Sequence, residues 1–276
     1  MPALVAYPGV TGSFSMGAAA AAFPEAEYLP CESFEAAAWA AAQGRADYAL
    51  LPVENSFAGA VIPTYALLEK QPLFIVGEIK RSIRHQLLGL PGASLAGIRR
   101  ISSHPQAIAQ CDVFLAGLEG VEIVPSANTA ISAKAVAEGG DLTAAAIASR
   151  EAAAAFGLTV LRGDIQTSGR NTTRFFIVSR DRTPLAPPDK ATVVFRVRNE
   201  VGALARVLNT FARHGLNMCR IESRPIPDTP FHYFFSADFE GDMDAARFET
   251  AMAEAGTCAA DLRVLGLYPR AAEVTG

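Results

Sequence analysis

The organisation of the chain is decided by one stretch, Asp181-Arg182-Thr183-Pro184-Leu185-Ala186-Pro187-Pro188-Asp189-Lys190. This stretch holds three prolines and four charged residues in ten positions. Because proline cannot donate a hydrogen bond within a central strand, the composition predicts an exposed linker. We therefore expect one domain at residues 1–180, a linker at 181–190 and a second domain at 191–270.

Strand and helix signals alternate before the linker. The expected strands are short apolar runs at 4–7, 46–53, 98–102, 122–125, 144–148 and 174–179. Helices are expected at 15–23, 33–44, 61–70 and 129–138, with a further helix starting at 104. Repeated strand–helix units predict parallel sheets with helices on both faces, and such sheets bind ligands where their strands end.

After the linker the order of signals changes to strand–helix–strand–strand–helix–strand. The expected elements lie at 191–197, 203–214, 216–226, 231–239, 242–255 and 262–267. The two middle strands are joined through Pro227-Asp228-Thr229-Pro230. This order predicts a ferredoxin-like domain.

Composition excludes several classes of protein. Hydrophobic residues make up 50% of the chain and charged residues 19%, which allows a large core. A net charge of −4 argues against nucleic acid as the partner, and the longest apolar run, 17–23, is too short to span a membrane. The four cysteines are far apart and form no CxxC pair, so we expect no disulfide framework, no metal site and a reducing cytoplasm.

Two polar segments follow expected strands in the first half of the chain. The turn Gly9-Val10-Thr11-Gly12-Ser13-Phe14-Ser15 is suited either to hold an anion at a helix N-terminus or simply to cap that helix. It lacks the lysine of a P-loop and the GxGxxG pattern, so a nucleotide-dependent enzyme is not supported. The segment Glu54-Asn55-Ser56 is placed either for a ligand cleft or as a loop cap.

Two further segments carry polar groups in the second half of the first domain. In Ser102-Ser103-His104-Pro105-Gln106, the histidine is a candidate acid or base, or else a helix cap. Gln106 and Gln110 lie four residues apart, hence on one helix face. In Asn171-Thr172-Thr173-Arg174-Phe175, hydroxyl donors stand beside an arginine that is either a carboxylate-binding fork or a surface residue on a strand.

In this order the four segments resemble those of the prephenate dehydratases. The second region supplies the family's usual companion: Gly202-Ala203-Leu204 and Ile221-Glu222-Ser223-Arg224-Pro225 resemble an ACT domain with its phenylalanine-binding motifs. The resemblance extends from about residue 7 to about residue 268.

The resemblance implies a fold of the α/β class. The catalytic domain would have two lobes of the type II periplasmic-binding-protein kind with the active site between them, followed by the ferredoxin-like ACT domain. The extended runs at 75–90 would cross between the lobes, and the return through 158–167 would bring Thr173 beside Asn55.

The resemblance also implies an activity. Prephenate would lose carbon dioxide and its ring hydroxyl to give phenylpyruvate in phenylalanine biosynthesis, which makes the enzyme a carbon–oxygen lyase that needs no cofactor. Thr173 would direct its hydroxyl at the departing oxygen, Arg174 would hold a carboxylate, and Glu54 would be a proton source. The implied substrate-binding residues are Asn55, Ser56, Ser103, Gln110, Thr172, Phe175 and Ser13.

The ACT domain implies regulation by L-phenylalanine and assembly into a homodimer or homotetramer. The implied effector-binding residues are Gly202, Ala203, Leu204, Asn217, Glu222, Ser223, Arg224 and Pro225. No helical segment of the chorismate mutase type precedes the first strand, so we expect a monofunctional enzyme.

Two alternatives stay open. An arogenate dehydratase would perform the same chemistry on the transaminated substrate. A non-catalytic amino-acid sensor would use the two lobes for binding alone, although a pure binder would not require Thr173-Arg174-Phe175.

Overall fold

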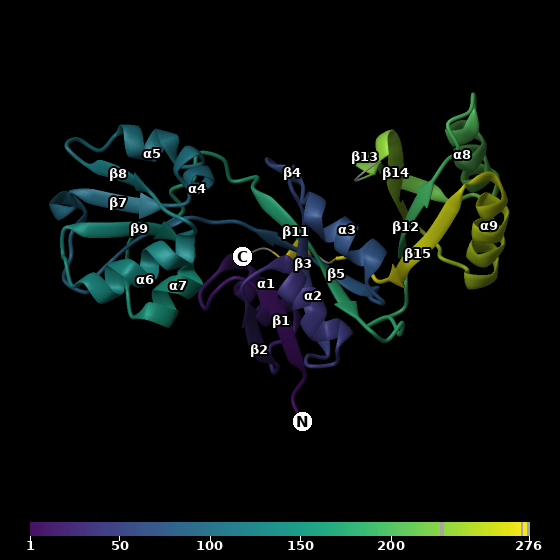
Figure 1. Cartoon of the computed structure of the whole chain (residues 1–276). Coiled ribbons are helices and arrows are strands. Elements are labelled where there is room, and N and C mark those ends of the chain that lie inside the picture. The colour runs from purple at the N-terminus through teal and green to yellow at the C-terminus, as the bar shows by residue number, and fades with distance from the viewer. Residues whose placement is uncertain (227–228, 272, 275–276) are drawn as a thin grey trace.

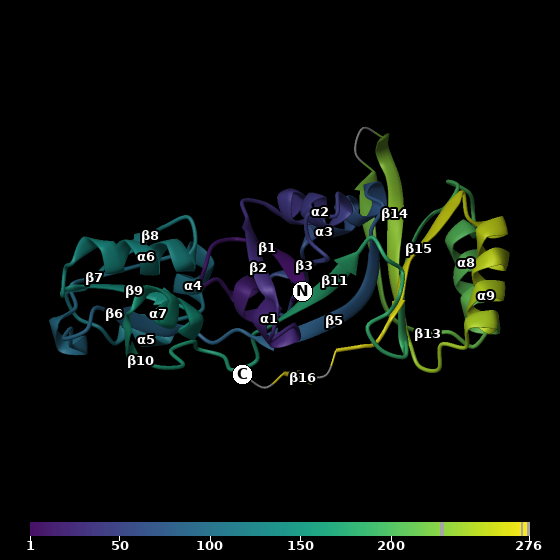
Figure 2. The same cartoon turned by 90° about the horizontal axis from the view of Figure 1, so that it is seen from below.

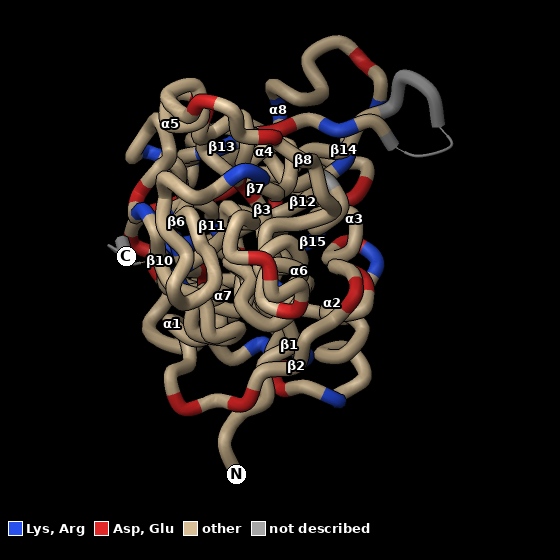
Figure 3. Tube along the Cα trace, turned by 90° about the vertical axis from the view of Figure 1, so that its left-hand side faces the viewer, with Lys and Arg blue, Asp and Glu red and all other residues tan. Residues whose placement is uncertain are grey.

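The computed structural model describes residues 1–226, 229–271 and 273–274. Its three sheets follow one another along the molecule, with the first lobe in the middle, the second lobe on one side and the C-terminal sheet on the other (Figures 1 and 2). Basic and acidic residues are interspersed along the trace (Figure 3). Within the described residues, the helices are too short or too polar to cross a bilayer.

The first lobe is built on a sheet with the strand order β16-β5-β11-β3-β1-β2. Its strands are β1 (Leu4–Pro8), β2 (Glu27–Cys31), β3 (Tyr48–Asn55), β4 (Gly59–Ala60), β5 (Phe74–Ser82), β11 (Thr172–Ser179) and β16 (Glu273–Val274). Its helices are α1 (Phe14–Ala22), α2 (Phe34–Ala42) and α3 (Ile62–Lys70). Serines cap the first two helices, since the hydroxyls of Ser13 and Ser33 accept hydrogen bonds from the first turn.

The second lobe is built on a sheet with the order β10-β6-β9-β7-β8. Its strands are β6 (Gln86–Gly89), β7 (Arg100–Ser103), β8 (Glu122–Pro125), β9 (Ala144–Ala148) and β10 (Thr159–Arg162). Its helices are η1 (Leu95–Gly97), α4 (Pro105–Ala109), α5 (Asp112–Ala116), α6 (Thr129–Gly139) and α7 (Arg150–Phe156).

The chain crosses between the lobes twice, as a type II periplasmic-binding-protein fold requires. It leaves through residues 83–85 after β5 and returns through 163–171 before β11. The crossings are bonded to each other, because Ile83 N donates to Asn171 O and Ile165 N donates to His85 O. The predicted parallel pairing holds for β1, β2 and β3, but the returning β11 is antiparallel to β3 and β5, so the sheet is mixed.

The C-terminal part has the ferredoxin-like order β12-α8-β13-β14-α9-β15, with a sheet ordered β13-β14-β12-β15. The elements are β12 (Lys190–Arg196), α8 (Ala203–Arg213), β13 (Asn217–Ile226), β14 (Thr229–Glu240), α9 (Ala245–Cys258) and β15 (Asp261–Tyr268). Of the predicted connection between its middle strands, Pro227 and Asp228 lie outside the described residues.

The two faces of the first-lobe sheet are covered differently. One face packs on α1 through Phe175 and Ile177 of β11. The other face packs on α2 and α3 through Phe176 and Val178, and shares its core with Val194, Leu265 and Tyr268 of the C-terminal part. The boundaries predicted at 180 and 190 stay predictions, because the two parts share this core.

The contact between the two parts is close enough to require a glycine. A Cβ atom on Gly266 of β15 would lie 2.1 Å from the carbonyl oxygen of Ile75 on β5. No side chain fits at that distance, so the C-terminal sheet rests directly on the backbone of the first lobe.

Candidate active site

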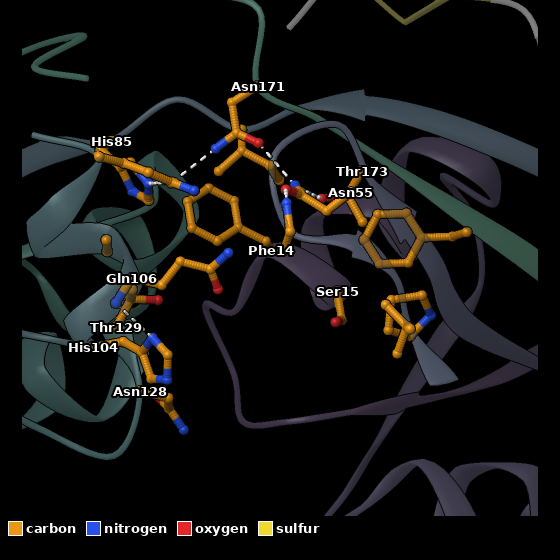
Figure 4. Close-up of a pocket in the computed structure, with 17 residues that line it drawn as sticks. Phe14, Ser15, Asn55, His85, His104, Gln106, Asn128, Thr129, Asn171 and Thr173 are labelled. Carbon is orange, nitrogen blue, oxygen red and sulfur yellow. Dashed lines mark hydrogen bonds between the residues drawn. The ribbon is translucent and has the colours of Figure 1, made fainter. Parts of the chain in front are cut away.

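A cavity of about 310 Å³ lies between the two lobes. Figure 4 shows Asn55, Thr173, Phe14 and Ser15 of the first lobe on one side and His104, Gln106, Asn128 and Thr129 of the second lobe on the other. The remaining lining residues are Pro52, Ala58, Val61, Ile83, His85, Ala107, Gln110, Asn171 and Phe175.

Asn55 holds the hydroxyl of Thr173. Its Nδ2 lies 2.9 Å from Thr173 Oγ1, across the β3–β11 pairing that sets these two residues side by side. The expected return of Thr173 beside Asn55 is therefore confirmed. Because Asn55 donates this bond, Thr173 Oγ1 accepts it and keeps its own proton for another acceptor.

The same amide continues a chain of hydrogen bonds toward the second lobe. Asn55 Nδ2 also donates to Asn171 Oδ1 at 2.8 Å, and Asn171 Nδ2 donates to Gln110 Oε1 at 2.8 Å. Gln110 Oε1 lies 2.8 Å from His85 Nε2 as well. These bonds join a strand of the first lobe, both crossing segments and the end of α4 in the second lobe (Figure 4).

His85 is a buried, uncharged end of this chain. Burial lowers its pKa below the ordinary value of 6.5, although the hydrogen bond with Gln110 acts in the opposite direction. Its ring stands edge-on to that of Phe14, with 5.5 Å between the ring centroids. Its Nδ1 is buried without a hydrogen-bond partner among the described residues.

The cavity presents donors without formal charge. Among the described residues that line it, none is an aspartate, glutamate, lysine or arginine. The first turns of α1 and α6 reach it with Phe14, Ser15 and Thr129, and the first backbone N–H groups of a helix carry partial positive charge. Such an arrangement suits an anionic ligand held by hydrogen bonds.

Four of the predicted catalytic and substrate-binding residues line the cavity: Thr173, Asn55, Gln110 and Phe175. Arg174, which was predicted to hold a substrate carboxylate, does not line this cavity, and its predicted role stays a prediction. Successive side chains on a strand point to opposite faces, so Arg174 lies on the face turned away from the cavity. There it is 6% exposed, and its Nη1 lies 2.8 Å from Asp238 Oδ2 of β14.

Glu54 is placed with Arg174, outside the cavity. Its Oε2 lies 3.3 Å from Arg174 Nε and 3.9 Å from Arg220 Nε of β13. Glu78 lies 3.2 Å from Arg174 Nη1 and 3.0 Å from Lys190 Nζ. Burial acts to lower the pKa of Arg174, but the carboxylates of Asp238 and Glu78 outweigh it and raise the pKa above its ordinary value.

The other predicted substrate-binding residues have structural contacts instead. Ser13 caps α1 by accepting from Met16 N, and the buried Ser103 donates to Ile147 O at 2.7 Å. Ser56 accepts from Thr172 N and donates to Arg170 O, which ties the loop after β3 to β11. The structure places none of Ser13, Ser56, Ser103 and Thr172 among the residues that line the cavity.

Several of the expected capping roles in these segments are also observed. Asn55 Oδ1 accepts from Phe57 N and Ala58 N, and His104 Nδ1 accepts from Gln106 N. The cavity residues that we had not predicted include Ser15 and Asn171, which stood inside the quoted motifs. His85 gave no signal beyond its place in an extended crossing run.

A second cavity of about 260 Å³ lies in the C-terminal part. It is lined by the predicted residues Gly202, Ala203 and Leu204, together with Tyr233 and Phe235 of β14. Asn217 and the segment Glu222-Ser223-Arg224-Pro225 lie on the neighbouring edge strand β13 and do not line it. Glu222 forms ion pairs with Arg220 and Arg224.

Metal-binding groups are not assembled anywhere in the described ranges. Within residues 1–226, 229–271 and 273–274, no group of three or more histidine, cysteine, aspartate or glutamate side chains is arranged to hold a metal ion.

Comparison with known proteins gives matches over nearly the whole chain. The model of the prephenate dehydratase family matches residues 5–183, and the ACT domain model matches residues 191–256. Arogenate dehydratase/prephenate dehydratase 6 of Arabidopsis thaliana is 39% identical over 285 residues, which cover 96% of this chain and 68% of the relative. A bifunctional N-acyl-homoserine lactone acylase/prephenate dehydratase of Komagataeibacter europaeus is 39% identical and covers 96% of this chain and 95% of the relative.

Among solved structures, the prephenate dehydratase of Arthrobacter aurescens in complex with L-Phe has a TM-score of 0.87 at 36% identity. The match covers 97% of this chain and 90% of that one.

Proposed function

The chain belongs to the prephenate dehydratase family, a family of lyase-type dehydratases, and from that premise we propose that its substrate is prephenate and its product phenylpyruvate. The observation that carries the proposal is the bond from Asn55 Nδ2 to Thr173 Oγ1 at 2.9 Å. This bond leaves the Thr173 hydroxyl proton free for the departing ring oxygen.

The protein has two tasks in this reaction: it must position the substrate and supply a hydrogen-bond donor to the departing oxygen. Loss of the ring hydroxyl and of carbon dioxide makes the ring aromatic, so the driving force lies in the substrate. The ring carboxylate leaves as carbon dioxide, its bonding electrons form the new double bond of the ring, and the ring hydroxyl leaves as hydroxide, which takes up a proton from solvent to give water. A hydrogen-bond donor directed at that oxygen lowers the barrier where negative charge develops.

Prephenate is favoured over arogenate by the charges of the cavity. Arogenate carries an ammonium group where prephenate carries a keto oxygen. A buried ammonium needs an anionic partner, and the described lining residues include no carboxylate. The amide N–H groups of Gln110 and the hydroxyl of Thr173 suit an acceptor instead.

The surroundings of Thr173 do not favour the acylase activity for which the relative from Komagataeibacter europaeus is named. Amide hydrolysis by a threonine needs an adjacent base that takes up its proton. The neighbour of Thr173 is Asn55, whose amide donates to the hydroxyl and cannot take a proton from it.

Regulation by L-phenylalanine is proposed from the cavity at Gly202, Ala203 and Leu204. The segment Glu222–Pro225 lies beside this cavity on β13, an edge strand whose pairing groups face outward. We propose that a second copy pairs at this edge and completes the effector site, giving a homodimer or a homotetramer. Sedimentation that shows only monomer, with and without phenylalanine, would contradict this assembly.

Effector binding can be tested with a matched pair of variants. Tyr233, 44% exposed, lines the proposed effector cavity, whereas Trp39, 46% exposed, lies on α2. L-Phenylalanine should raise the melting temperature of the wild type and of Trp39→Ala, and should act more weakly on Tyr233→Ala. An equal shift in all three would contradict the proposed effector site.

The reducing cytoplasm remains the proposed compartment. The four cysteines (Cys31, Cys111, Cys219 and Cys258) are all free thiols. Recovery of the protein in an exported fraction after cell fractionation would reject this proposal.

The activity is tested with purified protein and three substrates. We expect phenylpyruvate from prephenate, a much lower kcat/KM with arogenate, and no cleavage of an N-acyl homoserine lactone. Turnover of arogenate alone would keep the mechanism and change the substrate. If the folded protein turns over neither prephenate nor arogenate and yet binds phenylalanine, it is an amino-acid sensor instead.

A further inference from the structure

The hydrogen bonds around the cavity have a direction that the backbone sets. Phe57 N and Ala58 N each donate to Asn55 Oδ1 at 3.0 Å. A backbone N–H can only donate, so the oxygen of the Asn55 amide must stand at this end. Its Nδ2 therefore faces Asn171 and Thr173, as the distances to both show.

The orientation of the Asn55 amide fixes the orientations of the next two amides, Asn171 and Gln110. Asn171 turns its oxygen to Asn55 Nδ2, so its nitrogen faces Gln110. Gln110 must then present oxygen to Asn171. The same oxygen lies 2.8 Å from His85 Nε2, so that ring nitrogen must be the donor. A backbone loop of the first lobe thus decides which nitrogen of His85 carries the proton.

The orientation of the Gln110 amide determines which of its groups can bind a ligand. Its oxygen accepts from Asn171 and His85 together, while its Nε2 has no hydrogen-bond partner among the described residues. Gln110 lines the cavity, so it presents N–H groups there. Without His85, one of the two bonds that hold this orientation is lost.

We propose that His85 is a positioning residue for the dehydration. Its Nε2–H donates to Gln110 Oε1 and so keeps the Gln110 amide turned with its N–H groups toward the substrate. This inference rests on the proposed function, since the substrate acceptor that Gln110 meets is a carboxylate or keto oxygen of prephenate.

His85 and Gln110 are both held by the segments that cross between the lobes. Its backbone N–H donates to Gln166 Oε1 and its carbonyl accepts from Ile165 N, so both crossing segments hold it. Gln110 is itself held by the returning segment, because its carbonyl accepts from Thr167 N. A shift of one lobe against the other would therefore move the donor and acceptor of this bond together with the hinge.

The first test is independent of turnover. The chain has four histidines, so nuclear magnetic resonance of ¹⁵N-histidine-labelled protein gives few signals, and His85→Gln identifies the one from His85. We expect His85 to be protonated on Nε2 and bare on Nδ1 at neutral pH. A proton on Nδ1 alone, or a doubly protonated ring, overturns the proposal even if the protein proves inactive on prephenate.

The second test uses kinetics and the conservative variant. His85→Phe keeps a ring beside Phe14 but removes the donor, and should lower kcat/KM for prephenate by about tenfold, the order expected when one hydrogen bond is lost. His85→Gln places an amide N–H near the position of Nε2 and should restore most of that loss. A merely structural role predicts no such rescue.

The third test asks whether His85 acts through Gln110. In a Gln110→Ala background, His85→Phe should change kcat/KM by less than about twofold, because the group it positions is gone. A full tenfold loss in that background, or wild-type kcat/KM in His85→Phe alone, overturns the proposal. If His85→Phe fails to fold, His85→Leu serves as the donor-free variant, and the tautomer remains measurable in the wild type.

Discussion

Thr173 and Arg174 are neighbours on β11, yet Thr173 faces the cavity between the lobes while Arg174 Nη1 lies 2.8 Å from Asp238 Oδ2 of the C-terminal sheet. The alternation of a strand separates them to its two faces. One strand therefore carries the proposed reactive hydroxyl on one side and a buried ion pair to the ACT domain on the other.

We expect Thr173→Val to lower kcat for prephenate by about a hundredfold or more, in the range that a positioned donor contributes. Valine has nearly the shape of threonine and lacks the hydroxyl. KM should change little, because the ground state does not need this donor. Steady-state kinetics check both values, and Thr173→Ser, which restores a hydroxyl, should recover much of kcat. A valine variant as active as the wild type would exclude the role proposed for Thr173.

Asp238→Asn should lower the free energy of unfolding by about 3 kcal/mol, the order expected when one partner of a buried ion pair is removed. Asp238 is fully buried, and asparagine keeps its shape and the acceptor for Thr192 Oγ1 while leaving Arg174 with one carboxylate fewer. KM for prephenate should stay close to the wild-type value, because this face does not line the cavity. Urea denaturation and kinetics measure the two effects.

The matched control for that variant is Asp261→Asn. Its carboxylate lies 2.9 Å from Arg196 Nη1, but the side chain is 60% exposed. Solvent screens such a pair, so the loss should stay below about 1 kcal/mol. If both variants lose the same stability, burial does not set the strength of the Arg174–Asp238 pair.

The sequence predicted the fold well because its motifs stand in the order of a known family, and three of the four follow a strand while the fourth begins β11. It also predicted that Thr173 returns beside Asn55. The alternation of side chains along a strand also indicates that Thr173 and Arg174 face opposite sides of β11, as the structure shows. The sequence could not show that Ser103 donates to a backbone carbonyl and that Ser13 caps a helix, because a hydroxyl in a motif can make either contact or bind a substrate.

His85 could not have been found from the sequence in the same way. It is a single histidine in an extended run, and its significance depends on Gln110, 25 residues further along, and on the crossing of the two segments. Only the tertiary structure brings these groups together. The helix α7, absent from our predicted elements, likewise matters through its contact with the first lobe.

We expect Gly12→Ala to hinder closure of the two lobes. Gly12 has φ +80°, and a Cβ there would lie 2.7 Å from Cα of Ala152 on α7. Its carbonyl also accepts from Ser149 Oγ at 2.6 Å, next to the ion pair between Arg81 and Glu151. The variant should raise KM and lower kcat/KM by about tenfold, as misplacement of substrate-binding groups does.

Gly120→Ala is the control that separates the steric clash with Ala152 from the conformational cost of an alanine at positive φ. Gly120 has φ +67°, but a Cβ at this position would meet nothing within 4 Å, so the variant shares only the strain of a left-handed alanine, about 1 kcal/mol. Its melting temperature should fall while KM stays unchanged. Equal KM values for the two variants would show that the contact at Ala152 does not control closure.

The stability of the protein should fall as pH drops below 6.5, in part because of His85. Folded His85 has a lowered pKa, so as pH falls through 6.5 the unfolded chain takes up the proton first. The free energy of unfolding then decreases with falling pH until the folded pKa is reached, by at most about 1.4 kcal/mol per pH unit for one proton. Well above 6.5 both states are neutral at this residue and the contribution is constant. Urea denaturation of wild type and His85→Gln across this range isolates the effect, since carboxylates such as Glu240 and Glu254 titrate in both. Parallel curves for the two proteins would mean that burial does not lower the pKa of His85.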